Sequence, residues 1–254
     1  MGSASHERAG DSAKKFWLER SKAGFAAYKQ RQAVISRRRL YPVTLFYSLY
    51  SVILLGWTLR SSHLLAGLLF FAAGIVNWTL VEYLSHRYIL HGHFADGEGR
   101  VRRFLHRRLD PLHWEHHARP WDGMHINGTI GDLLPLFLVC APLSFIAPAH
   151  TLPLLLAGTV QGYVVEEWVH HSVHFYHFKN PYFRYIKRHH LYHHSPKGSD
   201  LGYGLSSGVW DVVWGTRYPE SIRNALYRRP RSSRRRRGVD SADPDVPTEP
   251  SPSE

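Results

Sequence analysis

Histidine is the residue type whose number and spacing in this sequence could do chemistry. The chain has 19 histidines in 254 residues, and histidine is the commonest protein ligand for metal ions. A metal-storage tract would place them contiguously. Here they recur instead in four spaced groups: His86 and His91; His113, His116 and His117; His170 and His174; and His190, His193 and His194.

The spacing within each group indicates how its side chains can be directed. Residues three or four apart share one face of a helix, so the members of the last three groups can each point one way. His86 and His91 are five apart, which needs a helix end, a bulge or a change of direction. Together the ten imidazoles could supply two metal ions with about five nitrogens each, and imidazole suits zinc, copper, iron and nickel alike. Which groups meet in space is left open by the sequence.

Four hydrophobic segments are the elements that must position these histidines. They cover roughly residues 40–59, 64–84, 130–147 and 152–169, and each is near the roughly 20 residues that a helix needs to cross a bilayer. The last two segments are shorter and contain prolines, so they could be tilted, kinked or only partly spanning. Each pair of segments is followed by a spaced histidine pair and then by a His-x2-His-His group, which is a weak twofold repeat.

The charges indicate the orientation of these segments. The net charge is +12 with histidine neutral, and no lysine or arginine lies between residues 129 and 175. Basic residues gather before residue 40, in 85–128 and after 175, and cytoplasmic loops carry such an excess. Both termini, the middle loop and all four histidine groups are therefore predicted to be cytoplasmic. No nucleic-acid motif is present, so the charge fits an anionic membrane surface rather than a nucleic acid.

We therefore expect an all-α integral membrane protein, with about four transmembrane helices in two hairpins and a cytoplasmic helical cap that carries a di-metal histidine cluster. Residues 1–39 form a basic N-terminal segment that can lie as a helix on the membrane surface, and residues 40–227 form the membrane domain. Residues 228–254 read as a disordered tail, basic and then acidic. The single cysteine, Cys140, excludes an internal disulfide and a cysteine-ligated metal site.

Longer motifs around the histidines resemble a known superfamily. They are EYLSHRYILH (82–91), EEWVHHSVH (166–174), and HHLYHH (189–194) followed by LGYGLSSGVWDVVWGT (201–216). Their order resembles the fatty acid hydroxylase/sterol desaturase superfamily, and within it most closely the fatty acid 2-hydroxylases that modify sphingolipid acyl chains. The resemblance covers roughly residues 40–220, with Glu167 where an aspartate is usual.

The resemblance implies O2-dependent hydroxylation of a lipid acyl chain by two iron ions, with zinc as a substitute in purified protein. The ten grouped histidines would be the ligands. His171 and His189 adjoin ligands and, with Glu167 and Asp211, are candidates to hydrogen-bond them. Fatty acid 2-hydroxylases often carry a cytochrome b5 domain, which nothing here resembles, so we expect a separate electron donor of cytochrome b5 or ferredoxin type. The lipid substrate would enter from the bilayer. A bacterial inner membrane is preferred over the endoplasmic reticulum.

Other functions remain open at this point. Hydroxylation of a carotenoid, or hydroxylation or desaturation of a sterol, uses a similar histidine pattern, although the segment 201–216 favours the acyl-chain reaction. A non-enzymatic membrane metal-binding protein is disfavoured because transporters place ligands along a path through the membrane. Residues 204–208 match the G-x-S-x-G pattern of serine hydrolases, but that pattern needs a preceding strand and a following helix.

Overall fold

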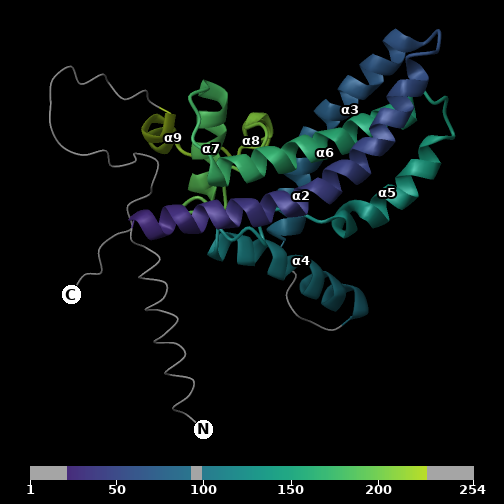
Figure 1. The fold of residues 1–254 in the computed structure, drawn as a ribbon. Coiled ribbons are helices and arrows are strands. Elements are labelled where there is room, and N and C mark those ends of the chain that lie inside the picture. Colours follow the sequence, from purple (N-terminus) through teal and green to yellow (C-terminus); the bar gives the residue numbers. More distant parts are fainter. Residues whose placement is uncertain (1–21, 93–98, 228–254) are drawn as a thin grey trace, which may run out of the picture.

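The described part of the structure, a computed structural model, comprises residues 22–92 and 99–227 (Figure 1). All regular secondary structure in these two ranges is helical, which confirms the all-α prediction. Nine elements follow one another: α2 (Lys22–Thr58), α3 (Leu64–Leu84), the π-helical turn η1 (Ser85–Leu90), α4 (Arg100–Ala118), α5 (Ile130–Ser144), α6 (Leu152–Phe175), α7 (Pro181–His193), α8 (Val209–Val213) and α9 (Glu220–Tyr227).

Two of these helices are long and apolar enough to cross a membrane, over Gly24–Thr58 and Leu64–Leu90. Their outward faces are apolar: Leu45 and Leu65 are both more than two thirds exposed. Apolar faces this extensive are expected where a protein meets lipid. The third predicted segment corresponds to α5, a shorter apolar helix of 15 residues.

Helix α6, the fourth predicted segment, is the central helix of the bundle. It packs along both α3 and α2, whereas α2 and α3 contact each other little. Most of its residues are buried, so neighbouring helices rather than lipid surround much of it. The histidine-bearing ends of η1, α4, α6 and α7 meet at one end of the bundle (Figure 1).

Helix α2 runs unbroken through the expected boundary between residues 39 and 40. It includes Pro42, although proline removes a backbone hydrogen bond from a helix interior. Ala33 packs with Ile126 and Phe175, so part of the stretch expected to lie separately on the membrane surface belongs to the bundle. Residues 1–21 and the expected tail, 228–254, lie outside the described residues.

The crossing of α3 and α6 depends on two glycines. A Cβ atom at Gly158 would overlap the carbonyl oxygen of Phe71, and one at Gly74 would overlap the carbonyl oxygen of Leu155. Small residues at such crossings let two helix backbones approach closely in membranes. The approach matters for the histidines because α3 leads into η1 and α6 ends at His174.

Gly158→Ala should therefore destabilise the protein, whereas Gly56→Ala should not. A Cβ at Gly56 would meet no atom within 4 Å, so alanine there should raise the stability by about 0.5–1 kcal/mol through its higher helix propensity. At Gly158 the added carbon must push two backbones apart, at a cost of about 1–3 kcal/mol. Thermal unfolding in detergent should show opposite shifts for the two variants. Equal shifts would mean that the crossing is not tightly packed.

Candidate metal centre

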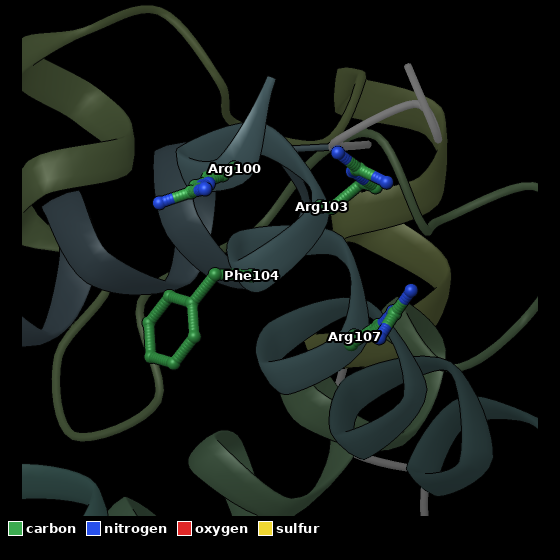
Figure 2. Close-up of a pocket in the computed structure, with 4 residues that line it drawn as sticks. All are labelled: Arg100, Arg103, Phe104 and Arg107. Atoms are coloured by element: carbon green, nitrogen blue, oxygen red, sulfur yellow. The ribbon is translucent and has the colours of Figure 1, made fainter. Parts of the chain in front are cut away.

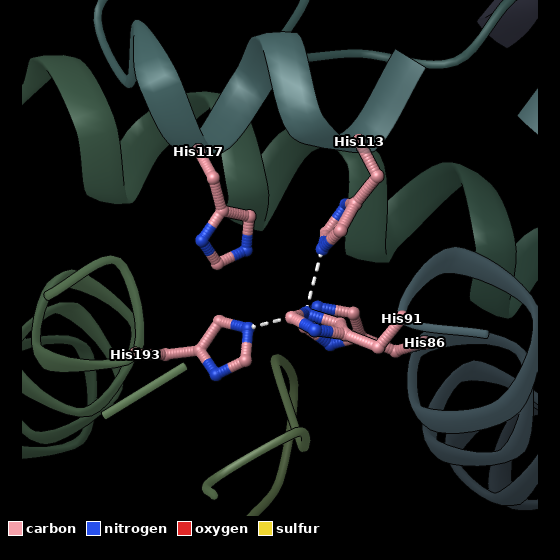
Figure 3. Close-up of side chains that lie close together, drawn as sticks. All are labelled: His86, His91, His113, His117 and His193. Atoms are coloured by element: carbon pink, nitrogen blue, oxygen red, sulfur yellow. Dashed lines mark hydrogen bonds between the residues drawn. The ribbon is translucent and has the colours of Figure 1, made fainter. Parts of the chain in front are cut away.

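The four histidine groups of the sequence converge in the structure. Every one of the ten lies in one of two sets of five, within which the potential ligand atoms are all within 4.8 Å of one another. The first set, shown in Figure 3, contains His86, His91, His113, His117 and His193. The second set contains His116, His170, His174, His190 and His194.

The two sets divide both of the His-x2-His-His motifs. On α4, His113 and His117 belong to the first set and His116 to the second. On α7 the pair His190 and His194 belongs to the second set and the intervening His193 to the first. The expectation that each motif points one way is wrong here, because successive helical residues are rotated by about 100° and adjacent histidines diverge.

The division gives both sets the same composition. Each receives a histidine pair from the end of a long helix, an i,i+4 pair from one cap helix and a single histidine from the other cap helix. The weak twofold repeat of the sequence therefore reappears in space. The sets are neighbours, since the rings of His117 and His194 have centroids 4.4 Å apart.

The π-helical turn explains how His86 and His91 reach one site. The backbone N–H of His91 donates to the carbonyl of His86, with 3.0 Å between the nitrogen and the oxygen. A bond from residue i to residue i+5 widens the helix, so residues five apart come onto one face. Of the three alternatives that the sequence spacing left open, the structure has the bulge, and both rings enter the first set (Figure 3).

The distances between ring nitrogens fit metal binding. In the first set, His91 Nε2 lies 2.7 Å from His113 Nε2 and 3.0 Å from His193 Nε2. In the second, 2.9 Å separates the Nε2 atoms of three pairs: His116 and His170, His174 and His190, and His190 and His194. Two nitrogens each about 2.1 Å from one ion, at right angles to each other, are about 3 Å apart.

Unsatisfied nitrogen atoms also fit a bound cation. Nε2 of His117 is buried and has no hydrogen-bond partner within the described residues, and Figure 3 shows its ring directed toward the other four of the first set. Leaving a buried polar group without a partner is costly. A metal ion bound by the lone pair of this nitrogen would remove that cost, so the residues present suit the group that the histidine pattern implies.

The protonation state of the cap histidines suits ligation as well. Burial, reinforced by neighbouring imidazoles, holds the pKa of His113, His190 and His193 well below the usual histidine range. Burial lowers the pKa of His117 to about 4. These rings are therefore neutral near pH 7, and the neutral ring is the form that binds a metal.

One loop orients two histidines of the first set. Nδ1 of His86 lies 2.5 Å from the carbonyl oxygen of Tyr203, and Nδ1 of His193 lies 2.8 Å from that of Leu201. A carbonyl oxygen only accepts, so both Nδ1 atoms carry the proton and both Nε2 lone pairs face the cluster. Such partners of metal-binding histidines fix the tautomer and the ring orientation.

Two buried carboxylates hold this loop. Asp211 accepts hydrogen bonds from the backbone N–H groups of Tyr203 and Gly204, at 2.9 and 3.0 Å, and from the Thr216 hydroxyl at 2.7 Å. Glu82 Oε1 accepts from the backbone N–H groups at positions 205 and 206, at 2.6 and 2.8 Å. Asp211 was a candidate from the sequence to hydrogen-bond a ligand; within the described residues it bonds instead the loop whose carbonyls accept from His86 and His193. Glu82 was missed, although a lone carboxylate in an apolar helix four residues before His86 was a usable signal.

The other three candidates from the sequence, His189, His171 and Glu167, have different surroundings. His189 lies beside the loop, with Nε2 3.4 Å from Asp211 Oδ2 and Nδ1 2.8 Å from the Tyr227 hydroxyl. The other two belong to a buried network that joins α2, α6 and the segment 126–128. There His171 Nδ1 is 2.7 Å from Ser36 Oγ, and Glu167 accepts from the Asn127 amide at 2.9 Å.

The G-x-S-x-G match does not have the setting of a serine nucleophile. Residues 204–208, which carry the match, form a loop with no strand before it in the described chain, and the helix that follows, α8, has 5 residues. The backbone N–H groups of residues 204–206 donate to Asp211 and Glu82. The serine hydrolase interpretation is therefore rejected.

Comparison with known proteins identifies relatives of this chain. The family model described as fatty acid hydroxylase matches residues 71–216. A dihydroceramide fatty acyl 2-hydroxylase of Arabidopsis thaliana is 34% identical over 57% of this chain and 59% of its own length. A ceramide very long chain fatty acid hydroxylase of Saccharomyces cerevisiae is 33% identical over 64% of this chain and 41% of its own. This chain thus spans about 40–60% of these relatives.

One solved structure is also similar, that of full-length scs7p with only its hydroxylase domain visible. It matches with a TM-score of 0.60 and 29% sequence identity, over 71% of this chain and 67% of that one. The region matched by the family model contains all ten clustered histidines and the loop that orients two of them.

Proposed function

The chain belongs to the fatty acid hydroxylase family, and on that premise we propose that it hydroxylates a lipid acyl chain, at carbon 2 of a fatty acid or ceramide. The observation that carries the proposal is the pair of adjacent five-histidine sets. The plant and yeast relatives are named for acting on dihydroceramide or ceramide acyl chains, which supports this substrate class.

We propose that the ten histidines hold two iron ions, with zinc able to replace iron during purification. The reaction consumes O2, two electrons and two protons, converts one C–H bond to C–OH and releases water. An unactivated methylene has no acidic proton that a side chain could remove, so a redox metal must supply the O2 chemistry. The electrons would come from a separate donor of cytochrome b5 or ferredoxin type.

The chain's own residues would orient the ligands. The loop that carries Leu201 and Tyr203 would fix two rings of the first set, and Asp211 and Glu82 would keep this loop in place. His189 would support Asp211 through the contact of its Nε2 with Asp211 Oδ2, at 3.4 Å. His171 would tie α6 to Ser36 of α2, and Glu167 would tie α6 to Asn127 and Gly128. Both would thereby fix the end of α6 from which His170 and His174 project.

We also propose the membrane arrangement that this activity needs. The helices α2 and α3 would form one spanning hairpin and α5 and α6 a second, with α4 and α7–α9 as a cytoplasmic cap. Support comes from the apolar outward faces of α2 and α3 and from the absence of lysine and arginine between residues 129 and 175. As preferred from the sequence, we propose a bacterial inner membrane rather than the endoplasmic reticulum as its location.

Expression in a host without 2-hydroxylated lipids tests the function. Total fatty acids released by hydrolysis are compared by mass spectrometry for the parent, His113→Ala, His190→Ala and the matched control His150→Ala, whose histidine lies outside both sets. We expect 2-hydroxy acids from the parent and the control alone. Membrane-inserted, iron-loaded protein that makes none, with a reductant supplied, would contradict the proposal. Carotenoid and sterol substrates would then be tested next.

The two proposed metal positions should differ in how firmly they hold metal. Two rings of the first set donate to backbone carbonyls, whereas Nδ1 of His116, His174 and His194 in the second set has no partner within the described residues. Loss of such outer partners typically lowers metal affinity about 10–100-fold. Dialysis against a graded chelator, followed by elemental analysis, should give a plateau at one metal per chain. Loss of both metals in a single step would contradict this asymmetry.

A further inference from the structure

The N-terminal half of α4 presents an arginine-rich surface whose role the proposed hydroxylation does not explain. Arg100, Arg103, Phe104 and Arg107 line a surface depression of about 410 Å³ (Figure 2). All four side chains are exposed. Phe104 is followed four positions later by a further arginine in the sequence, and the stretch from residue 99 to 109 contains five arginines and no acidic residue.

The spacing places these side chains on one face. Positions 100, 103, 104 and 107 are separated by three and four residues, so they form a single stripe along the helix. Figure 2 shows Arg100 near Phe104 and Arg103 near Arg107, and the members of each pair are four positions apart. Within the described ranges, none of the three arginines forms an ion pair. The stripe is thus a cluster of positive charge with an aromatic ring among it.

The position of α4 in the fold indicates which anion this cluster meets. It follows η1, where a long apolar helix ends with Tyr88 54% and Ile89 42% exposed. Helix α4 packs mainly against η1, and its first turns project from the bundle (Figure 1). On those turns Val101 is 73% and Phe104 64% exposed. Exposed apolar side chains interspersed with arginines, beside the end of a spanning helix, are typical of a helix at the lipid headgroups.

We propose that the N-terminal half of α4 binds the phosphate groups of anionic phospholipids at the surface of the membrane, through Arg100, Arg103 and Arg107 with Phe104 inserted beside them. The proposal rests on the membrane arrangement proposed above. Helix α4 continues from Arg107 to His113, which lies only about 9 Å further along the helix axis. Lipid binding would therefore also fix the helix that carries three of the proposed ligands. The surface of the bilayer would then help to place the metal centre.

The test uses the full chain reconstituted in lipid nanodiscs. Val101→Cys, in a Cys140→Ser background, is labelled with a polarity-sensitive dye, and its emission is followed as phosphatidylglycerol replaces phosphatidylcholine. The variant Arg100→Gln/Arg103→Gln/Arg107→Gln is compared with Arg31→Gln/Arg60→Gln/Arg217→Gln, which removes three exposed arginines from other parts of the chain. Co-elution of protein with discs in gel filtration reports membrane insertion separately.

We expect a blue shift with phosphatidylglycerol in the parent and in the control variant, weakened by salt because the attraction is screened. Each arginine near an anionic surface contributes about a fivefold gain in binding, so loss of three should weaken the response about a hundredfold. An identical response in the α4 variant, or none in the parent, would overturn the proposal. An acidic redox protein is also added to discs of phosphatidylcholine alone. If only this addition caused the blue shift, the proposal would be overturned in favour of a protein partner. Failure to co-elute would overturn its membrane premise.

Discussion

Replacing His116 and replacing its neighbour His117 should remove different metal ions. His116 lies with the second set and His117 with the first, so each alanine variant should keep one metal per chain. Both should lose product formation by more than about a hundredfold, since loss of a residue that only hydrogen-bonds a ligand can already cost about that much. Elemental analysis and lipid mass spectrometry on the same preparations would check both expectations.

Double variants make this prediction specific to the division of the sets. His116→Ala/His190→Ala removes two ligands of one set and should still leave one metal per chain. His116→Ala/His117→Ala removes one ligand from each and should leave none. His125→Ala, which removes a histidine paired with Asp122 outside both sets, should keep two. If the two double variants retained equal metal, the assignment of adjacent residues to separate ions would be wrong.

Asp211→Ala should weaken metal binding at the first set, and thereby remove its advantage over the second set, whose affinity should stay unchanged. The substitution leaves the backbone N–H groups of Tyr203 and Gly204 buried without their acceptor, at a cost of about 1–3 kcal/mol for each group. The loop would then loosen and its carbonyls would no longer orient His86 and His193. We expect a 10–100-fold loss of affinity for one of two metals, measured by competition with a chelator.

Glu167→Ala separates this effect from general destabilisation. Glu167 is also a buried carboxylate that accepts backbone and amide hydrogen bonds, but it does not hold the loop of the first set. It should lower the thermal stability to a similar extent without a preferential loss of the metal of the first set. An equal loss of the first-set metal in the two variants would mean that Asp211 acts through overall stability alone.

Much of the candidate metal centre could be predicted from the sequence because ligand chemistry is local. The five-residue interval between His86 and His91 required a departure from the α-helix, and the structure supplies a π-helical turn. The partition of the ten histidines was not predictable. It depends on how α4 and α7 are rotated between the two long helical pairs, and that rotation comes from tertiary packing.

The fold was predictable where composition decides and less so where packing decides. The two long apolar helices follow from hydrophobic runs of sufficient length. The unbroken α2 was not foreseen, because the basic residues of 22–39 suggested a separate surface segment. In the structure, Ala33 packs with Ile126 and Phe175, so this stretch is part of the bundle. Glu82 was overlooked because its partners, the N–H groups of positions 205 and 206, lie far along the chain.

Oxygen-isotope labelling tests the central claim most directly, namely that the histidine centre inserts oxygen from O2 into an acyl chain. Cells that express the parent chain are grown under ¹⁸O2, and hydrolysed fatty acids are analysed by mass spectrometry with fragmentation that locates the hydroxyl group. We predict 2-hydroxy acids that carry one ¹⁸O atom in the hydroxyl group and that are missing from His113→Ala cells. A hydroxyl group that carries oxygen from water, or 2-hydroxy acids that persist in His113→Ala cells, would contradict the claim.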